Sequence, residues 1–166
     1  SEVQCGGGAM IDLGAHPMYL LCELYGELPV RVQSSFTQTL GRGVEDNAVS
    51  LLTFANGAIG VIDNSRQAVY GYDQRIEVFG SKGCITADNE TANNTTYYTV
   101  DGVKKEKPLW FFLERYNDAF IEEEKSFVEA CLNDTDTIVG AFDGLQPVLI
   151  AIAAKESCEK GGVPVK

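Results

Sequence analysis

The sequence predicts an α+β fold: a largely antiparallel, open-faced β-sheet with helices on one face and an oligomer interface on the other. One segment with helical spacing is followed by a run of strands with a period of two, and two further helical segments end the chain. Because the strands follow one another without intervening helices, we expect them to pair antiparallel. The strands from 48 to 62 carry apolar residues on both sides, which predicts self-association through the uncovered face of the sheet.

The first helix is predicted over residues 9–25. Its apolar residues recur near helical spacing, Gly26 is suited to end it, and Pro29 lies just beyond. The glycines 6–8 precede this helix, but they follow no strand and do not match GxGxxG. We therefore expect no dinucleotide to bind there.

From residue 30 to residue 100 the period of apolar residues changes to two. Asn56-Gly57 separates two such runs and is the strongest short hairpin signal, because both turn positions tolerate a positive φ. A second hairpin is expected around residues 80–83. Residues 97–100 are a candidate for one more strand, and residues 103–112 are expected to form a loop.

Two helices are predicted to close the chain, over residues 113–132 and 141–160. The inward stripe of the first is expected to be Tyr116, Phe120, Phe127, Val128 and Cys131, and that of the second Leu145, Leu149, Ile152 and Ala153. No repeat or linker divides the chain, so residues 1–166 are predicted to form a single domain.

The composition argues against several classes of function. The formal net charge of −11 argues against binding nucleic acid or an anionic membrane surface, since both need clustered Lys and Arg. A neutral polyol or sugar is indifferent to this charge. The apolar stretches are too short to cross a bilayer, and residues 1–4 lack the features of a signal peptide. The five cysteines form no CxxC pair, so we expect no metal site and reduced thiols in a cytoplasmic protein.

Asp12 and the single histidine, His16, are four residues apart. On one helix they would share a face, separated by roughly 6 Å of rise. The carboxylate could then accept a hydrogen bond from one ring nitrogen and leave the other nitrogen for a ligand. Such a histidine suits alcohol oxidation, because it can accept the hydroxyl proton that must leave as the hydride departs. The spacing alone favours a simpler interpretation, in which Asp12 caps the helix and His16 is an ordinary, partly buried residue.

A second candidate site is the segment 63–75, which is polar, aromatic and interrupted by glycine. Side chains of this kind hold hydroxyl-rich ligands. A solvent-exposed connection with a structural tyrosine explains the same residues equally well.

Three stretches resemble a known family. Residues 6–17, GGGAMIDLGAHP, resemble the opening of the C-terminal domain in the glucose–fructose oxidoreductase, inositol dehydrogenase and rhizopine-catabolism (Gfo/Idh/MocA) family. Residues 64–80, NSRQAVYGYDQRIEVFG, and residues 107–116, KPLWFFLERY, look like its inositol 2-dehydrogenase branch. The likeness covers nearly the whole chain.

The resemblance implies a two-domain dehydrogenase for a cyclic polyol such as myo-inositol, or a related sugar. Its N-terminal Rossmann domain, absent from this chain, would bind NAD or NADP. The C-terminal domain would form the substrate wall and associate into a dimer or tetramer. The family's active-site aspartate and histidine fall on Asp12 and His16, and its substrate-contacting tyrosine falls on Tyr72. The family's catalytic lysine belongs to the missing domain, so Lys107 is not expected to be its equivalent.

The resemblance makes catalysis the favoured interpretation of Asp12 and His16. The alternative is a non-catalytic module that binds a polyol or only dimerises, and retention of Asp12, His16 and Tyr72 counts against it. We expect the chain alone to fold, to self-associate and to show no dehydrogenase activity.

Overall fold

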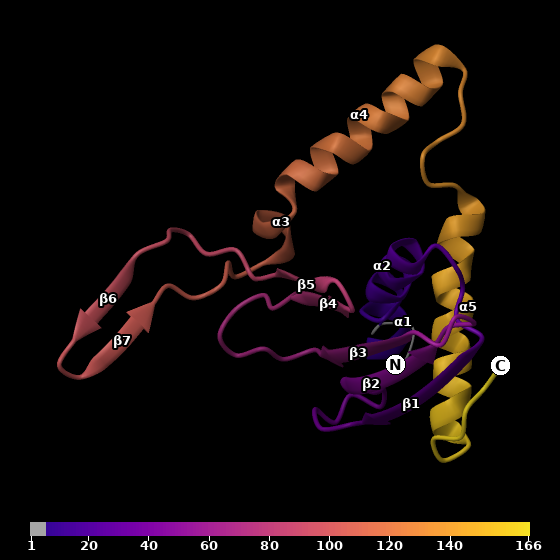
Figure 1. Cartoon of the computed structure of the whole chain (residues 1–166), viewed down its shortest axis with the longest axis horizontal. Coiled ribbons are helices and arrows are strands. Elements are labelled where there is room, and N and C mark those ends of the chain that lie inside the picture. Colours follow the sequence, from indigo (N-terminus) through magenta and orange to yellow (C-terminus); the bar gives the residue numbers. More distant parts are fainter. Residues whose placement is uncertain (1–5) are drawn as a thin grey trace. The chain divides into compact units, whose positions relative to one another are not determined.

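The computed structural model describes residues 6–166, so Cys5 lies outside the described part. The chain forms two compact units. The first combines the chain up to Gln67 with its last segment, Ile138–Lys166, and the second is Ala68–Thr137. Figure 1 labels the helices and strands of both units.

A three-stranded antiparallel sheet in the order β1-β2-β3 forms the centre of the first unit. Its strands are β1 (Arg31–Thr37), β2 (Asn47–Thr53) and β3 (Ile59–Ser65). Burial alternates along each strand, as expected for a sheet with one covered face. The covered face consists of Val32, Ser34, Ala48, Ser50, Leu52, Gly60 and Ile62.

The connection between β2 and β3 is the predicted hairpin, but its turn differs from the predicted one. The Phe54 carbonyl accepts a hydrogen bond from the Gly57 amide at 3.0 Å, and the Phe54 amide donates to the Ala58 carbonyl at 3.0 Å. Gly57 has a φ of 88°. Asn56 does not have a positive φ, because Asp134 is the sole described non-glycine residue that has one. Only Gly57 is therefore left-handed, as in a longer hairpin loop that ends in a glycine bulge.

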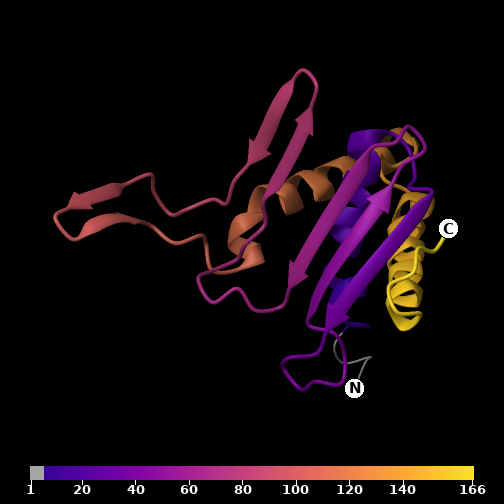
Figure 2. The ribbon, with the colours of Figure 1, turned by 60° about the horizontal axis from the view of Figure 1, so that its bottom comes forward.

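Three helices cover one face of this sheet (Figure 2). They are α1 (Ala9–Asp12), α2 (Ala15–Tyr25) and α5 (Ala141–Glu159). The core lies between these helices and the sheet, and its apolar side chains are removed from water, which is the main force that holds the layers together. Its buried members are Met10, Met18, Val32, Ala48, Leu52, Phe54, Ile62, Ala151 and Ala154.

A chain of buried serines ties α5 to the sheet. The Ser157 hydroxyl accepts a hydrogen bond from the Ser34 amide at 3.0 Å and donates to the Val163 carbonyl at 2.7 Å. The hydroxyls of Ser34 and Ser50 lie 2.7 Å apart and form a further hydrogen bond. Because buried polar groups are costly when unpaired, these bonds fix where α5 sits on the sheet.

The inward stripe predicted for the last helix is largely wrong. Leu145, Leu149 and Ile152 are about half exposed, and only Ala153 packs partly against the core. The fully buried face of α5 carries Pro147, Ala151, Ala154 and Ser157. This face has small side chains that allow the helix to approach the sheet closely, and the helical period alone does not distinguish it from the leucine face.

The second unit contains two separate β-hairpins, followed by two helices. Its strands are β4 (Ile76–Gly80), β5 (Gly83–Ala87), β6 (Thr96–Thr99) and β7 (Gly102–Lys105). The β4–β5 hairpin is the predicted one, and all pairs are antiparallel. Strand β7 corrects the loop predicted over residues 103–112, since Gly102, with a φ of 131°, lets the chain turn back onto β6.

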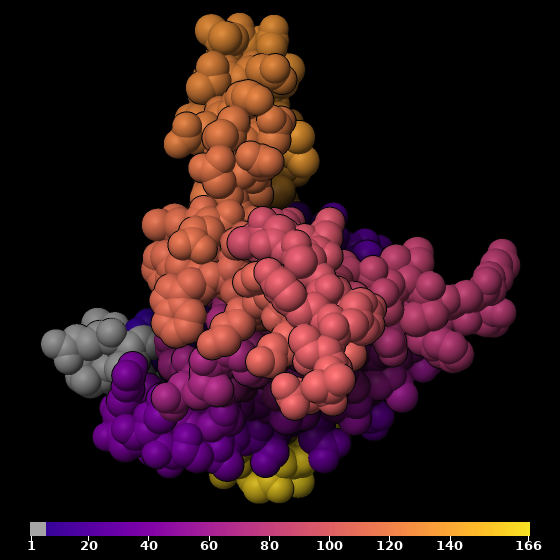
Figure 3. Space-filling view, turned by 90° about the vertical axis from the view of Figure 1, so that its left-hand side faces the viewer, coloured from indigo at the N-terminus to yellow at the C-terminus, as the bar shows by residue number. Residues whose placement is uncertain are grey.

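The helix predicted over residues 113–132 is interrupted at Tyr116, between α3 (Phe112–Arg115) and α4 (Asn117–Asn133). Helix α4 packs closely against no other element of its unit, and its side chains form a column in Figure 3. The stripe predicted for it is therefore wrong beyond Tyr116. Phe120, Phe127, Val128 and Cys131 are exposed.

The predicted α+β class is confirmed, with antiparallel strand pairs throughout and helices on one face of an open sheet. The expected single sheet is instead three strands and two separate hairpins. On the open face of the sheet, Val49, Leu51, Ile59 and Val61 are exposed. Among residues 6–166, no helix combines the length and the apolar character that a membrane span needs.

Candidate functional site

The chain bends between Asp12 and His16. Helix α1 ends at Asp12, and the amides of Leu13 and Gly14 both donate to the Ala9 carbonyl at 3.0 Å. The Gly14 bond spans one residue more than an α-helical bond, which is the geometry of a π-type turn. A Cβ on Gly14 would overlap the carbonyl oxygen of Met10, so the bend requires glycine. The expectation of one continuous helix through Asp12 and His16 is therefore wrong.

Asp12 is paired with Arg66 rather than with His16. A guanidinium nitrogen of Arg66 lies 2.8 Å from Asp12 Oδ2, and the Arg66 side chain is only 18% exposed. The Arg66 amide donates to the Asp46 carbonyl at 2.9 Å, which anchors Arg66 just beyond β3. Across the described residues, no hydrogen bond or ion pair joins Asp12 to His16. The ion pair thus fixes the direction of the Asp12 carboxylate.

His16 lies in the first turn of α2 and is exposed. In the part of the chain that the structure describes, its ring makes no hydrogen bond. Both ring nitrogens are therefore open to a ligand, and one of them can accept a proton. This differs from the partly buried histidine of the simpler interpretation, since His16 is exposed.

Glu45 holds the start of α1. Its buried carboxylate accepts a hydrogen bond from the Met10 amide at 3.2 Å, and its backbone carbonyl accepts from the Ala9 amide at 3.1 Å. The carboxylate lies against Gly8, where a Cβ would collide with it. A negative charge already occupies the position that a phosphate would take at this helix start. This arrangement disfavours phosphate binding by the glycines before α1.

Asp46 orders the loop before β2. Its buried carboxylate accepts hydrogen bonds from the Thr39 hydroxyl at 2.8 Å, the Asn47 amide group at 2.7 Å and the backbone amide of Leu40. Burial acts to raise the pKa of Asp46, but these hydrogen bonds outweigh it, and the pKa lies below its usual value. The Asp46 carbonyl is the acceptor that anchors Arg66.

Tyr72 lies in the second unit, on the segment that joins Gly71 to β4. The Tyr72 amide donates to the Leu109 carbonyl at 2.8 Å, and a Cβ on Gly71 would lie 2.8 Å from the Pro108 carbonyl oxygen. The structure therefore brings together two stretches that carry the family resemblance, 64–80 and 107–116. The Tyr72 ring meets the Tyr116 ring edge-on, with centroids 5.9 Å apart.

Asp73 fixes the backbone beyond Tyr72. Its carboxylate binds Arg75 through two bonds of 2.7 and 2.9 Å, and accepts from the Asn89 side chain at 2.6 Å and from the Tyr70 hydroxyl. The Arg75 guanidinium is the main cause that lowers the pKa of Asp73 to about 2. The segment around Tyr72 is thus rigidly supported by charge-assisted bonds.

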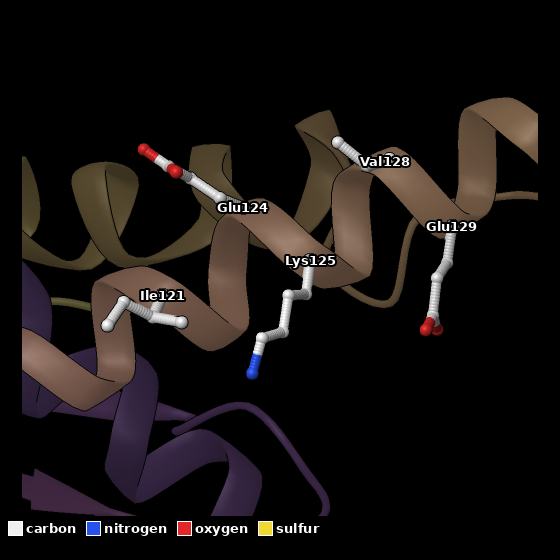
Figure 4. Close-up of a pocket in the computed structure, with 5 residues that line it drawn as sticks. All are labelled: Ile121, Glu124, Lys125, Val128 and Glu129. Carbon is white, nitrogen blue, oxygen red and sulfur yellow. The ribbon is translucent and has the colours of Figure 1, made fainter.

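Two surface hollows are lined by other residues. One is a depression on α4 alone, lined by Ile121, Glu124, Lys125, Val128 and Glu129 (Figure 4). The other lies between the end of α2 and Gln146 of α5. Neither includes Asp12, His16 or Tyr72, and the described residues contain no cluster of metal ligands.

Sequence reasoning missed Arg66, Glu45, Gln74 and Tyr116. Arg66 and Gln74 lie inside the segment 63–75 that was singled out, but no spacing rule links them to their partners. Glu45 carries no local signal either, since its partner, the Met10 amide, lies 35 residues away in the sequence.

The chain matches known proteins along its length. The family model described as GFO/IDH/MocA C-terminal domain matches residues 1–86. The protein called uncharacterized oxidoreductase YrbE, from Bacillus subtilis (strain 168), is 44% identical over 167 residues, covering 96% of this chain and 48% of that protein. A myo-inositol 2-dehydrogenase from Thermotoga maritima is 40% identical over 163 residues, covering 95% of this chain and 49% of that protein.

The chain also resembles a solved structure that contains both a cofactor and a polyol. It is the crystal structure of scyllo-inositol dehydrogenase from Lactobacillus casei with bound cofactor NAD(H) and scyllo-inositol. It is 26% identical to this chain with a TM-score of 0.86, and the match covers 96% of this chain and 48% of that one. The chain spans about half the length of the curated relatives it matches.

Proposed function

Because the chain belongs to the Gfo/Idh/MocA oxidoreductase family, we propose that it is the C-terminal, substrate-side domain of an NAD(P)-dependent dehydrogenase for a cyclic polyol such as myo-inositol. A related sugar is the neighbouring possibility within the same class. The observation that carries the proposal is the 40% identity to a myo-inositol 2-dehydrogenase across 95% of the chain. We propose that residues 1–166 act as one domain and that a Rossmann domain outside them binds the nucleotide.

The residues of this chain would handle the substrate and its proton. Oxidation of an alcohol removes a hydride and a proton, and NAD(P) held by the Rossmann domain would accept the hydride. His16 is proposed to accept the hydroxyl proton, since its exposed ring has both nitrogens open to a ligand. Asp12, oriented by Arg66, is proposed to accept a hydrogen bond from a substrate hydroxyl. Tyr72 is proposed to contact the polyol ring.

The function is tested by assaying the full-length protein with NAD and NADP across a panel of inositols and sugars. We expect NAD(P)H to form with myo-inositol or a close analogue. We expect none from residues 1–166 alone, because Glu45 blocks the glycine segment as a phosphate site. Turnover by the isolated chain, or an inactive full-length protein, would contradict the proposal.

We also propose that a second copy covers the open face of the sheet, giving a dimer or tetramer. Leu51 and Val61 are directly paired across β2 and β3, and Val49 and Ile59 extend the same apolar face along these strands. Arg31 and Asp63 also lie on this face, on the outer strands β1 and β3. They offer opposite charges to another copy of the chain. Apolar area of this kind on a sheet is typical of an interface.

A cytoplasmic location is part of the same proposal. Within the described range, Cys22, Cys84, Cys131 and Cys158 are free thiols, which suits a reducing compartment.

A further inference from the structure

Two tyrosine hydroxyls converge on one amide oxygen in the second unit. The Tyr72 hydroxyl donates to Gln74 Oε1 at 3.3 Å, and the Tyr116 hydroxyl donates to the same atom. An amide oxygen has two lone pairs and no proton, so it can accept from both phenols at once. The Tyr72 phenol has a single proton, and this proton is used in its bond to Gln74.

Gln74 is held from its backbone. Its backbone amide donates to the Asn89 side-chain oxygen at 2.7 Å, and the Asn89 side-chain nitrogen donates to the Asp73 carboxylate at 2.6 Å. The same Asp73 carboxylate is clamped by Arg75. The backbone of Gln74 is therefore fixed, and the two tyrosine hydroxyls hold its side-chain oxygen.

Tyr116 is held by residues at the junction of two helices. It lies at the junction of α3 and α4, and the Arg115 guanidinium lies 5.3 Å from the centre of its ring. Arg115 is itself paired with Glu90. The Phe112 ring, 6.5 Å from that of Tyr72, completes the aromatic surroundings.

We propose that Gln74 and Tyr116 are positioning residues for Tyr72, and that they make its hydroxyl oxygen a hydrogen-bond acceptor for a polyol hydroxyl. This inference rests on the proposed function. The Tyr72 proton is committed to Gln74, so only lone pairs remain to face a ligand. A polyol hydroxyl, which can donate, satisfies those lone pairs, whereas a carbonyl or ether oxygen does not.

The ionisation of the two phenols is compatible with this arrangement. Burial raises the pKa of both Tyr72 and Tyr116 above the ordinary value of 10.0, and a hydrogen bond between the two hydroxyls opposes this effect at Tyr72 and adds to it at Tyr116. Both hydroxyls therefore keep their protons at neutral pH and remain donors to Gln74.

The test uses the full-length enzyme and steady-state kinetics with myo-inositol. Gln74→Met keeps the length of the side chain but removes the amide, and Tyr116→Phe removes one hydroxyl while keeping the ring. We expect each to raise KM for the polyol about three- to tenfold, the size of one neutral hydrogen bond, with KM for NAD unchanged. Tyr98→Phe, an exposed tyrosine on β6, is the matched control and should change neither KM.

A double-mutant cycle separates positioning from mere structural support. If Gln74 and Tyr116 act through the Tyr72 hydroxyl, neither substitution raises KM further in a Tyr72→Phe background. An unchanged KM in both single variants of an active enzyme would overturn this inference alone, as would an equal rise with or without the Tyr72 hydroxyl. A wild-type enzyme that oxidises no polyol would overturn the proposed function and this inference with it. If Gln74→Met does not fold, Tyr116→Phe decides.

Discussion

Replacing Glu45 tests how the start of α1, and therefore the position of Asp12, is held. The Glu45 side chain accepts a hydrogen bond from the Met10 amide at 3.2 Å. Both residues are buried, with Glu45 3% and Met10 0% exposed. In Glu45→Ala the Met10 amide loses its partner without gaining access to water. In Glu45→Gln an amide oxygen can still accept this bond, and only the negative charge at the helix start is lost.

The two substitutions should differ in size. Leaving a buried amide unpaired costs about 1–3 kcal/mol. Loss of a charge near a helix N-terminus costs about 0.3–1 kcal/mol, and the low end applies to a helix as short as α1. Glu45→Ala should therefore lower the free energy of unfolding by about 2 kcal/mol, and Glu45→Gln by less than about 1 kcal/mol.

Urea unfolding of the chain, followed by far-ultraviolet circular dichroism, measures both effects. Glu123→Ala, at an exposed position on α4, is the control and should stay within about 0.5 kcal/mol of the parent. A loss in Glu45→Ala no greater than in this control would refute the account of the helix start. Equal losses in the Ala and Gln variants would show that charge, rather than the Met10 bond, is what matters.

Two further predictions concern acid stability and assembly. The Arg75 guanidinium, with hydrogen bonds from Tyr70 and Asn89, lowers the pKa of Asp73 from 3.8 to about 2. The stabilisation from ionised Asp73 is therefore present above about pH 4 and is lost as the pH falls toward 2. Asp73→Asn should lower the free energy of unfolding by about 1 kcal/mol at pH 7, with solvent screening included. Its free energy of unfolding should also depend less on pH between about 4 and 2 than that of the parent. Equal acid unfolding of parent and variant, measured by circular dichroism, would contradict this. Val61→Asp places a charge on the apolar sheet face and should shift the full-length protein to a smaller species in sedimentation velocity, whereas Val103→Asp, similarly exposed on β7, should not.

Much of the strand architecture could be predicted from local patterns. Period-two burial along β1 to β3 and the hairpins marked by Gly57 and Gly83 are properties of a few consecutive residues, and the structure contains them, although the turn at Gly57 differs in type. The bend at Gly14 could not be predicted in this way. It depends on how closely the Met10 carbonyl approaches and on Glu45, which comes from a distant part of the chain.

The candidate site shows the same division. The resemblance named Asp12, His16 and Tyr72. Their partners come from elsewhere in the sequence, since Arg66 follows β3 and Tyr116 lies between two helices. Spacing suggested that Asp12 pairs with His16, but a nearby guanidinium is a stronger partner for a carboxylate than an imidazole beyond a helix bend.

The most direct test of the central claim is the kcat/KM of full-length His16→Ala with myo-inositol and NAD. An imidazole that takes the hydroxyl proton contributes about a hundredfold or more to the rate, so kcat/KM should fall by at least that factor while NAD binding is kept. Activity equal to that of the parent would show that the proton leaves by another route, and His16 would have no part in the chemistry.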